Sequence, residues 1–232
     1  MTSRVLFADI DNTVTFYRPG SLSPERLLHG NFLFPILQQH LHYAGYSMQE
    51  SSSLIQEEIT RNVFWSYSSL IESLNLPSEK VFAEFRQWHR DNILVHQDAV
   101  AFIHQAMAKC IPVYFISNNP VDGCSMKLAC AGLCTEAGTP LPGIAGIFGT
   151  DVMKGCKDRA DCWRQAISTA NLSPQQIVTF GDNVQEDGEI PLAFGVFHSI
   201  IIPRAPLPAI DLSPQITIFQ EPIDSLFSWF FS

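Results

Sequence analysis

The chain has 232 residues, of which 46% are hydrophobic and 16% are charged, and its formal net charge is −9 at pH 7. This composition indicates a folded protein with one main domain and an insertion, and it excludes a disordered chain. The excess of acidic residues disfavours nucleic acid as a partner, because binding to a phosphate backbone requires clustered Lys and Arg. No apolar run approaches the roughly 18 residues that a transmembrane helix needs.

The first predicted strand, residues 5–8, is an apolar run that ends at two aspartates, Asp9 and Asp11. Because residues i and i+2 project to the same side of an extended chain, both carboxylates are expected to face one site. Neighbouring carboxylates repel each other unless a cation or a shared proton relieves them. The pair suits a nucleophile beside a general acid/base with Mg2+ between them. The alternative is an Asx-rich turn that merely ends a strand.

The segment 16–96 is predicted to be a helical bundle, because its apolar residues recur at helical spacing. Pro35 is expected to kink or break the first of these helices. Ser78 is expected to be the N-cap of a later helix. The apolar positions of the first helix are Leu28, Phe32, Ile36 and Leu37.

Two further apolar runs, residues 111–116 and 176–180, are predicted strands that also end at polar residues. Ser117 and Asn118 follow the first run, and a hydroxyl with turn backbone N–H groups can bind an anion. Asp182 follows the second run and is a hard oxygen ligand of the kind that Mg2+ requires. In an open parallel sheet, ligands bind beyond the carboxyl ends of the strands, so these polar residues are expected to meet there.

The six cysteines, between Cys110 and Cys162, contain no C-x-x-C pair and have no histidine at zinc-finger spacing. We interpret them as reduced, partly buried thiols, although a zinc site is an alternative. That site would use Cys124, Cys130, Cys134 and Cys156. Near the C-terminus, residues 216–219 are predicted to be a last strand, followed by an aromatic tail at 226–231 that packs on the core or forms a contact surface.

The order of these polar segments along the chain resembles the motifs of the haloacid dehalogenase (HAD) superfamily. Motif one is matched by Asp9, Asp11 and Thr13, motif two by Ser117, and motif four by Gly181 and Asp182 with Asp187. The resemblance implies an α/β fold with a Rossmann-like three-layer α/β/α core and a parallel sheet, formed by residues 1–15 and 97–232. It also implies that residues 16–96 are a helical cap that closes over the active site.

The third motif of the family is a lysine, for which Lys154 and Lys157 are both candidates. In relatives this lysine opens a helix that contains an aromatic residue and then an alanine. Trp163 and Ala166 follow Lys157 by six and nine positions, which fits that pattern, whereas counting from Lys154 does not. Lys157 is therefore assigned to motif three, and Lys154 is expected to lie on the surface. Asn12 stands where many relatives have glycine, which leaves both carboxylates of motif one in place.

The resemblance implies a Mg2+-dependent phosphatase that hydrolyses a small phosphorylated metabolite through an aspartyl-phosphate intermediate. Asp9 would be the nucleophile, Asp11 the general acid/base and Lys157 a further catalytic residue. The phosphoryl group would be bound by Thr13, Ser117, Asn118 and Lys157, and the metal by Asp9, Asp11, Asp182 and Asp187. Asp187 is expected either to reinforce the metal site or to hold the lysine, unless it is only a first-turn acid of a helix.

Two alternatives are a phosphomutase of the beta-phosphoglucomutase type and a non-catalytic binding protein with the same fold. The presence of Asp11 disfavours the dehalogenases, which lack this acid. Phosphonate-cleaving relatives need a cap lysine, and Lys80, the only lysine in 16–96, is interpreted as a surface residue. Arg61 is either a substrate contact or a solvated helix arginine. The first strand begins too early to leave room for a secretory signal, so a cytoplasmic location is expected. The sequence leaves the oligomeric state open.

Overall fold

The structure, a computed structural model, describes residues 4–21, 33–207 and 211–219. The chain divides into two compact units, which are described separately. The larger unit consists of residues 1–16 and 95–232, and the smaller unit of residues 17–94. Leu28, Phe32 and the aromatic tail at 226–231 lie outside the described residues.

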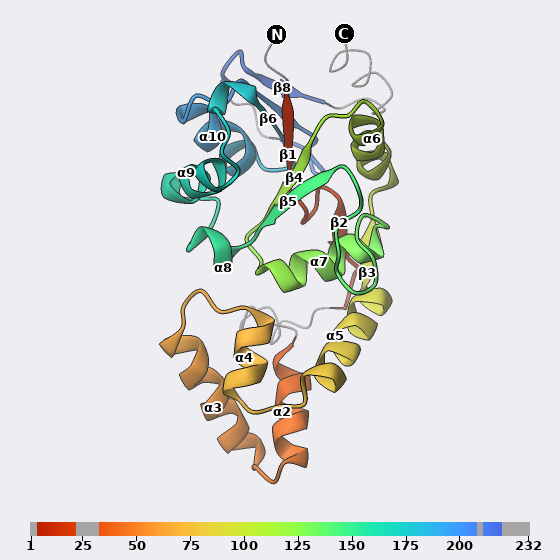
Figure 1. The fold of residues 1–232 in the computed structure, drawn as a ribbon, viewed down its shortest axis with the longest axis vertical. Helices are drawn as coiled ribbons and strands as arrows, with labels where there is room; N and C mark the ends of the chain where they lie inside the picture. Colours follow the sequence, from red (N-terminus) through yellow and green to blue (C-terminus); the bar gives the residue numbers. More distant parts are fainter. Residues whose placement is uncertain (1–3, 22–32, 208–210, 220–232) are drawn as a thin grey trace. The chain divides into compact units, whose positions relative to one another are not determined.

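A six-stranded sheet with the order β5-β4-β1-β6-β7-β8 forms the centre of the larger unit (Figure 1). Every neighbouring pair of these strands is parallel. The strands are β1 (Val5–Ala8), β4 (Val113–Ile116), β5 (Ile144–Phe148), β6 (Ile177–Gly181), β7 (His198–Ile201) and β8 (Ile216–Ile218). The strands predicted at 5–8, 111–116, 176–180 and 216–219 are thus confirmed, with ends that differ by at most two residues.

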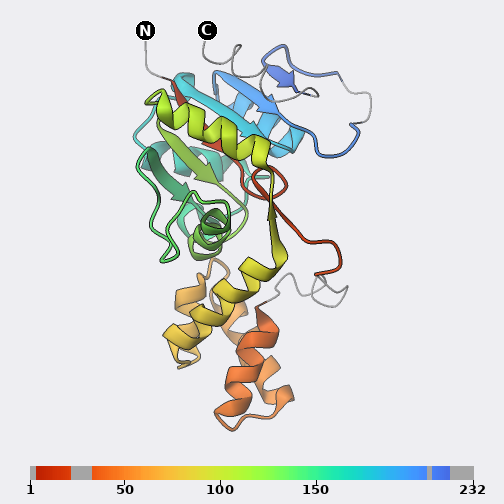
Figure 2. The same cartoon turned by 90° about the vertical axis from the view of Figure 1, so that its right-hand side faces the viewer.

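Helices cover both faces of this sheet (Figures 1 and 2). They are α6 (Gln97–Ala108), α7 (Val121–Cys130), α8 (Thr150–Met153), α9 (Ala160–Thr169) and α10 (Ile190–Ala193). The side chains of β1 alternate between the two layers, as the period of a strand requires. Leu6 and Ala8 belong to a core with α6 and α7, whereas Val5 and Phe7 pack in a second core with α8 and α9. The predicted three-layer α/β/α architecture is confirmed.

The carboxyl ends of β1, β4 and β6 lie side by side because β1 is the central strand of the three. In the strand register, Ala8 at the end of β1 is paired with Phe115 on β4 and with Phe180 on β6. The residues that follow these strands therefore emerge at one edge of the sheet. This edge is where ligands bind in open parallel α/β sheets.

The smaller unit is helical in its described part. Its helices are α2 (Phe34–Tyr43), α3 (Met48–Arg61), α4 (Tyr67–Ser73) and α5 (Ser78–Asn92). Leu37, Ile55, Leu70 and Phe85, one from each helix, are buried together with further apolar side chains of the unit. Two short strands, β2 (Thr15–Tyr17) and β3 (Ile93–Val95), pair where the chain passes between the units.

Pro35 lies in the first turn of α2, where backbone N–H groups have no intrahelical acceptor. The residues before Leu33 lie outside the described part of the chain, so the predicted kink or break at Pro35 stays a prediction. The prediction for the start of α5 is wrong. Ser78 is the first residue of α5, and the N-cap is Pro77, which makes no side-chain cap hydrogen bond. Among the described residues, no helix combines the length and the apolar character that crossing a membrane would need.

Candidate active site

Asp9 follows β1 directly and is almost completely buried, with 3% of its surface exposed. Its Oδ1 accepts a hydrogen bond from Lys157 Nζ, and its Oδ2 accepts one from Thr13 Oγ1 at 2.9 Å. The same threonine hydroxyl lies 3.4 Å from Asp182 Oδ1. Residues assigned to three separated motifs therefore meet at the carboxyl ends of β1 and β6.

Lys157 lies between two buried carboxylates. Besides its contact with Asp9, its Nζ donates to Asp187 Oδ1 at 2.7 Å. The lysine does not open a helix as expected, because it precedes the N-cap of α9 by two residues; its backbone carbonyl accepts a hydrogen bond from Trp163 Nε1 at 3.1 Å. Lys154 is exposed and ends α8 in a left-handed conformation, with a φ of 56°. The structure thus brings Lys157, and not Lys154, to the site.

Asp187 is positioned by a very close approach to Gly181, the last residue of β6. A Cβ atom at position 181 would lie 2.2 Å from Asp187 Cγ, so only glycine leaves room for this carboxylate. The Asn183 backbone N–H donates to Asp187 Oδ2 at 3.2 Å. Asp187 belongs to a π-helical turn, η2 (Val184–Glu189), and its Oδ1 is occupied by the lysine. Of the alternatives raised for Asp187, the structure places it where it holds the lysine.

The electrostatics of the site show an excess of negative charge. Burial raises the pKa of Asp9 to about 8, and the Asp187 and Asp11 carboxylates add to this effect, whereas Lys157 opposes it. Burial and the Asp187 carboxylate likewise raise the pKa of Asp182 to about 6. Burial alone would lower the pKa of Lys157, but Asp187 and Asp9 outweigh it and hold that pKa above its ordinary value. Lys157 therefore stays protonated, but its single positive charge does not offset the negative charge of the carboxylates around it.

The carboxylates fit a hard divalent cation. Ligand oxygens of Asp9, Asp182 and Asp187 lie within 4.8 Å of one another. Oxygen donors of this kind are the ligands that Mg2+ prefers, and its charge would offset the repulsion that raises the pKa values. Lys157 pairs with one oxygen each of Asp9 and Asp187, so all three carboxylates remain candidates to hold the ion.

The cysteines form no comparable cluster. Within the described part of the chain, the three aspartates are the only group of three or more His, Cys, Asp or Glu side chains arranged to hold a metal ion. All six thiols are free, and three of them are buried. The zinc alternative raised from the sequence is therefore wrong for Cys124, Cys130, Cys134 and Cys156, since the structure does not gather their sulfur atoms.

Asp11 is contacted by two residues that the sequence analysis did not assign. Its Oδ2 accepts from Asn119 Nδ2 at 2.7 Å and from Ser117 Oγ at 3.2 Å. Its Oδ1 accepts from the ammonium group of Lys127, a fully buried residue of α7. A sequence signal for Lys127 exists, because it is a single charge inside the apolar run 126–130.

Asn118, predicted to bind substrate, is exposed, and its side chain bridges neighbouring segments. Its Oδ1 accepts the backbone N–H of Lys157 at 2.7 Å, and its Nδ2 donates to Glu186 Oε2 at 2.8 Å. The side chain thus fixes the segment that carries the lysine relative to the end of β4. This contact is a second way in which motif two supports the site.

Arg204, which follows β7, is a further residue that the sequence analysis missed. Its guanidinium donates to the carbonyl of Thr13 at 3.0 Å and to that of Asn12 at 3.3 Å. It also forms two hydrogen bonds with the Asp98 carboxylate, at 2.8 and 3.0 Å. Asn12 has a left-handed φ of 58°, a conformation that asparagine adopts more readily than most residues and that explains its presence in place of glycine. Arg204 therefore anchors the turn that carries both motif-one aspartates.

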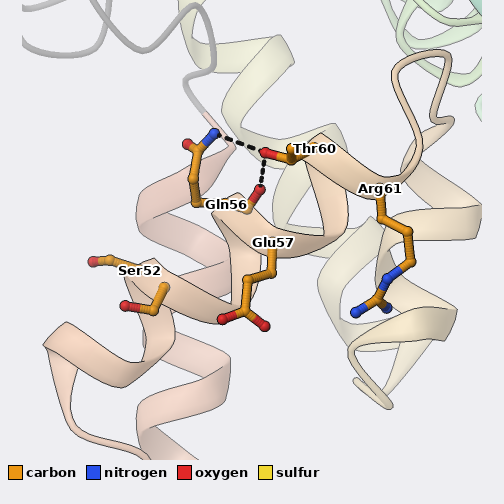
Figure 3. Close-up of a pocket in the computed structure, with 6 residues that line it drawn as sticks. Ser52, Gln56, Glu57, Thr60 and Arg61 are labelled. Carbon is orange, nitrogen blue, oxygen red and sulfur yellow. Dashed lines mark hydrogen bonds between the residues drawn. The ribbon is translucent and has the colours of Figure 1, made fainter.

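Arg61 lies beside an open pocket of about 750 Å3 along α3 in the smaller unit (Figure 3). The pocket is lined by Ser52, Ser53, Gln56, Glu57, Thr60 and Arg61. The Arg61 side chain is 69% exposed and pairs with Glu58, three residues earlier on the same helix. Its contacts are those of a solvated helix arginine, which was the second interpretation of this residue.

Comparison with known proteins gives matches at the level of structure. No protein-family model matches the sequence, and no curated protein matches it. The structure is similar to that of a HAD phosphatase from Thermococcus onnurineus, with a TM-score of 0.58 and 16% identity over 98% of this chain and 97% of that chain. It is also similar to YfnB from Bacillus subtilis, a putative HAD-hydrolase bound to magnesium, with a TM-score of 0.56 and 12% identity over 99% of each chain.

A dehalogenase has a comparable similarity, with a TM-score of 0.56 and 15% identity over 98% of this chain and 97% of that chain. At these identities the similarity establishes a common fold. Proteins that share this fold carry out different reactions, so the reaction has to be argued from the residues of the site.

Proposed function

We propose that this protein, which has the fold of the haloacid dehalogenase superfamily, is a Mg2+-dependent phosphatase that hydrolyses a small phosphorylated metabolite. One observation carries the proposal: Lys157 lies against the buried Asp9 carboxylate, while Asp11 emerges two residues later from the same turn. A nucleophile, a cation and an acid/base are thereby supplied at one sheet edge, as phosphoryl transfer through a covalent intermediate requires. The phosphatase and the magnesium-bound hydrolase among the similar structures support this choice.

In the first step, a carboxylate oxygen of Asp9 attacks phosphorus as the bond between phosphorus and the leaving oxygen breaks. Asp11 donates a proton to that oxygen, and the product alcohol departs. In the second step, water attacks phosphorus while Asp11 removes a proton from it. The bond between Asp9 and phosphorus then breaks, which releases phosphate and restores the Asp9 carboxylate and the protonated Asp11 carboxyl group.

The remaining residues orient and stabilise the phosphoryl group. Lys157 supplies positive charge beside Asp9, and the hydroxyl of Ser117 lies beside Asp11 at the end of β4. Thr13 orients Asp9 through the hydrogen bond to its Oδ2. A Mg2+ ion held by Asp9, Asp182 and the backbone carbonyl of Asp11 would supply the positive charge that the buried carboxylates and the phosphoryl oxygens lack.

The proposal is tested by incubating the purified protein with a panel of phosphate esters, with Mg2+ or with excess EDTA, and measuring free phosphate. We expect hydrolysis of at least one sugar phosphate, nucleoside monophosphate or phosphoglycolate-like ester, and loss of that activity in EDTA. Asp9→Asn should reduce turnover by about a thousandfold or more, because it removes the nucleophile. The exposed Asp158→Asn is the matched control and should retain activity.

Other outcomes would contradict the proposal. Near wild-type phosphate release by Asp9→Asn would exclude Asp9 as the nucleophile. Conversion of a sugar phosphate to its isomer without free phosphate would indicate a phosphomutase. Failure to turn over any ester of a broad panel in Mg2+ would favour a non-catalytic binding protein.

A further inference from the structure

The Asp11 side chain is held on both of its oxygens by groups that belong to the β4–α7 segment. Lys127 Nζ contacts Oδ1, while Asn119 Nδ2 donates to Oδ2 at 2.7 Å. Ser117 Oγ donates to the same Oδ2 at 3.2 Å. The carboxylate group is therefore fixed in its rotation about the side-chain bonds as well as in its position.

Lys127 differs from Asp11 in its exposure, and this difference indicates which residue holds the other. The Lys127 side chain is 0% exposed, whereas the Asp11 side chain is 31% exposed. A lysine is seldom fully buried, because removing its ammonium group from water is unfavourable without a charged partner. The buried lysine is thus a fixed hydrogen-bond donor, and the Asp11 side chain that it contacts is the partly exposed member of the pair.

Asn119 is also anchored by its surroundings. Its backbone carbonyl accepts the Thr150 N–H at 3.0 Å, and its backbone N–H donates to Ser117 Oγ at 3.2 Å. Its side-chain Nδ2 lies 3.2 Å from the same hydroxyl. Lys127 is on a helix whose neighbouring residues Cys124 and Leu128 belong to the hydrophobic core. Lys127 is therefore carried by a helix packed in the core, and Asn119 by a bend whose backbone is hydrogen-bonded, so each is held in place as a precisely aimed acid/base requires.

We propose that Lys127 and Asn119 are positioning residues that hold the Asp11 carboxyl group in the orientation for proton transfer to the leaving oxygen. This inference rests on the proposed phosphatase function and assigns that reaction two residues outside the family motifs. Neither residue contacts the phosphorus or the leaving group; each acts through Asp11. The competing explanation is that the Lys127–Asp11 pair only stabilises the fold.

The two explanations differ in how the effect of a mutation depends on the leaving group. An alkoxide is a strong base and needs a proton as it leaves, whereas p-nitrophenolate is a weak base and leaves without one. The ratio kcat/KM reports on steps up to the loss of the leaving group, so it isolates proton donation by Asp11 from the later attack by water. A misplaced Asp11 should therefore lower kcat/KM much more for an alkyl ester than for p-nitrophenyl phosphate.

The experiment compares wild type, Lys127→Met and Asn119→Ala in Mg2+, using p-nitrophenyl phosphate and the best alkyl ester of the panel. Methionine keeps the unbranched length of lysine and removes its charge and its donors. We expect each variant to lower kcat/KM for the alkyl ester by at least about tenfold more than for p-nitrophenyl phosphate. Lys154→Met, at an exposed lysine, is the control and should change neither value.

The outcomes separate this inference from the proposed function. Equal losses on both esters, or no loss on either, would overturn the positioning role while wild-type turnover kept the phosphatase proposal intact. No turnover of any ester by wild type would refute the phosphatase proposal and this inference with it. If the buried Lys127→Met fails to fold, as circular dichroism would show, the partly exposed Asn119→Ala decides the question alone.

Discussion

Single residues of the site show that it contains more negative charge than a buried environment favours. Asp9 and Asp182 have pKa values raised by burial to about 8 and about 6, and Lys157 offsets only part of the repulsion. A raised carboxyl pKa means that the folded protein binds the proton more tightly than the unfolded chain does. Ionising these groups at neutral pH therefore destabilises the metal-free fold.

Asp182→Asn should stabilise the metal-free protein at neutral pH. For Asp182 the folded state binds more protons than the unfolded state between pH 3.8 and about 6, so its contribution to the free energy of unfolding falls across that window and stays low above it. Removing the charge should raise Tm in EDTA more at pH 7 than at pH 4. It should also abolish any rise in Tm on adding Mg2+, as differential scanning fluorimetry would show.

The control for this prediction is Asp158→Asn, which neutralises an exposed carboxylate next to Lys157 in the chain. It should leave both the pH profile of Tm and its response to Mg2+ unchanged. A lower Tm for Asp182→Asn at pH 7 in EDTA would show that this carboxylate stabilises the fold without metal.

Gly181→Ala should disrupt the site by displacing Asp187. The added Cβ would lie 2.2 Å from Asp187 Cγ, which is far shorter than a van der Waals contact distance. Asp187 cannot move away easily, because it is buried and hydrogen-bonded to Lys157. We expect a loss of roughly 3 kcal/mol in the free energy of unfolding, measured in urea, together with a large loss of phosphate release. Gly188→Ala is a matched control, since its nearest atom is the flexible end of Ile216 at 3.2 Å. Equal effects at the two glycines would contradict the steric argument.

At the scale of elements, the site depends on contacts between segments that are distant in the chain. Arg204, after β7, joins the turn after β1 to Asp98 at the start of α6. Burial alone would raise the pKa of Asp98, but hydrogen bonds from Arg204 and from the Ala99 N–H lower it below its ordinary value. The arginine thus satisfies two carbonyls and a carboxylate at once, which its planar guanidinium allows.

Arg204→Ala should destabilise the protein by about 1–3 kcal/mol, because the Asp98 carboxylate and two turn carbonyls lose their hydrogen-bond donor. Arg204→Lys should restore only part of this stability, because an ammonium group cannot reproduce the forked contact with Asp98. Arg164→Ala is the control. Arg164 also pairs with an aspartate, Asp161, but both side chains are about two-thirds exposed, so little stability should be lost in a urea titration.

The sequence predicted those elements whose residues carry a strong local signal. β1 and β6 were found because each is a short, fully buried apolar run. β5 and β7 were not, because β5 contains an exposed alanine and a glycine and β7 begins with histidine and serine, which weakens the apolar pattern. The helix start predicted at Ser78 was wrong, since capping depends on backbone geometry that composition does not determine.

The contacts of the site were predictable where a family motif names the residue and not elsewhere. Asp9 and Lys157 meet although 148 positions separate them, and the order of the motifs indicated this. Lys127 lies 116 positions from Asp11 and Arg204 lies 191 from Thr13, and neither belongs to a motif. Such pairs depend on strand order and register, which a single sequence does not specify.

At the scale of the whole molecule, the two units have separate hydrophobic cores. Phe102 is fully buried in the larger unit, where its ring lies 4.7 Å from that of Phe180. Phe85 is fully buried in the smaller unit, where its ring packs edge-on against Tyr67. Among the described residues, the two core clusters of the larger unit contain only residues of that unit.

Phe85→Ala and Phe102→Ala should therefore destabilise different parts of the protein. Each truncation removes a buried aromatic ring and should cost about 3–5 kcal/mol of local stability. Hydrogen exchange read by mass spectrometry should show faster exchange mainly at 34–92 for Phe85→Ala and mainly in the sheet for Phe102→Ala. Uniform acceleration along the chain in both variants would indicate that the molecule unfolds as one cooperative body.

The central position of β1 has a consequence for synthesis on the ribosome. β1, which leads to the proposed nucleophile Asp9, is translated before its two neighbours in the sheet, which begin at residues 113 and 177. At a synthesis rate of about 5–20 residues per second, roughly ten seconds or more pass before the second neighbour of β1 has been made. The helices at 34–92 leave the ribosome during that interval and can form from local contacts. The proposed site is thus completed only after β6 has been translated and has paired with β1.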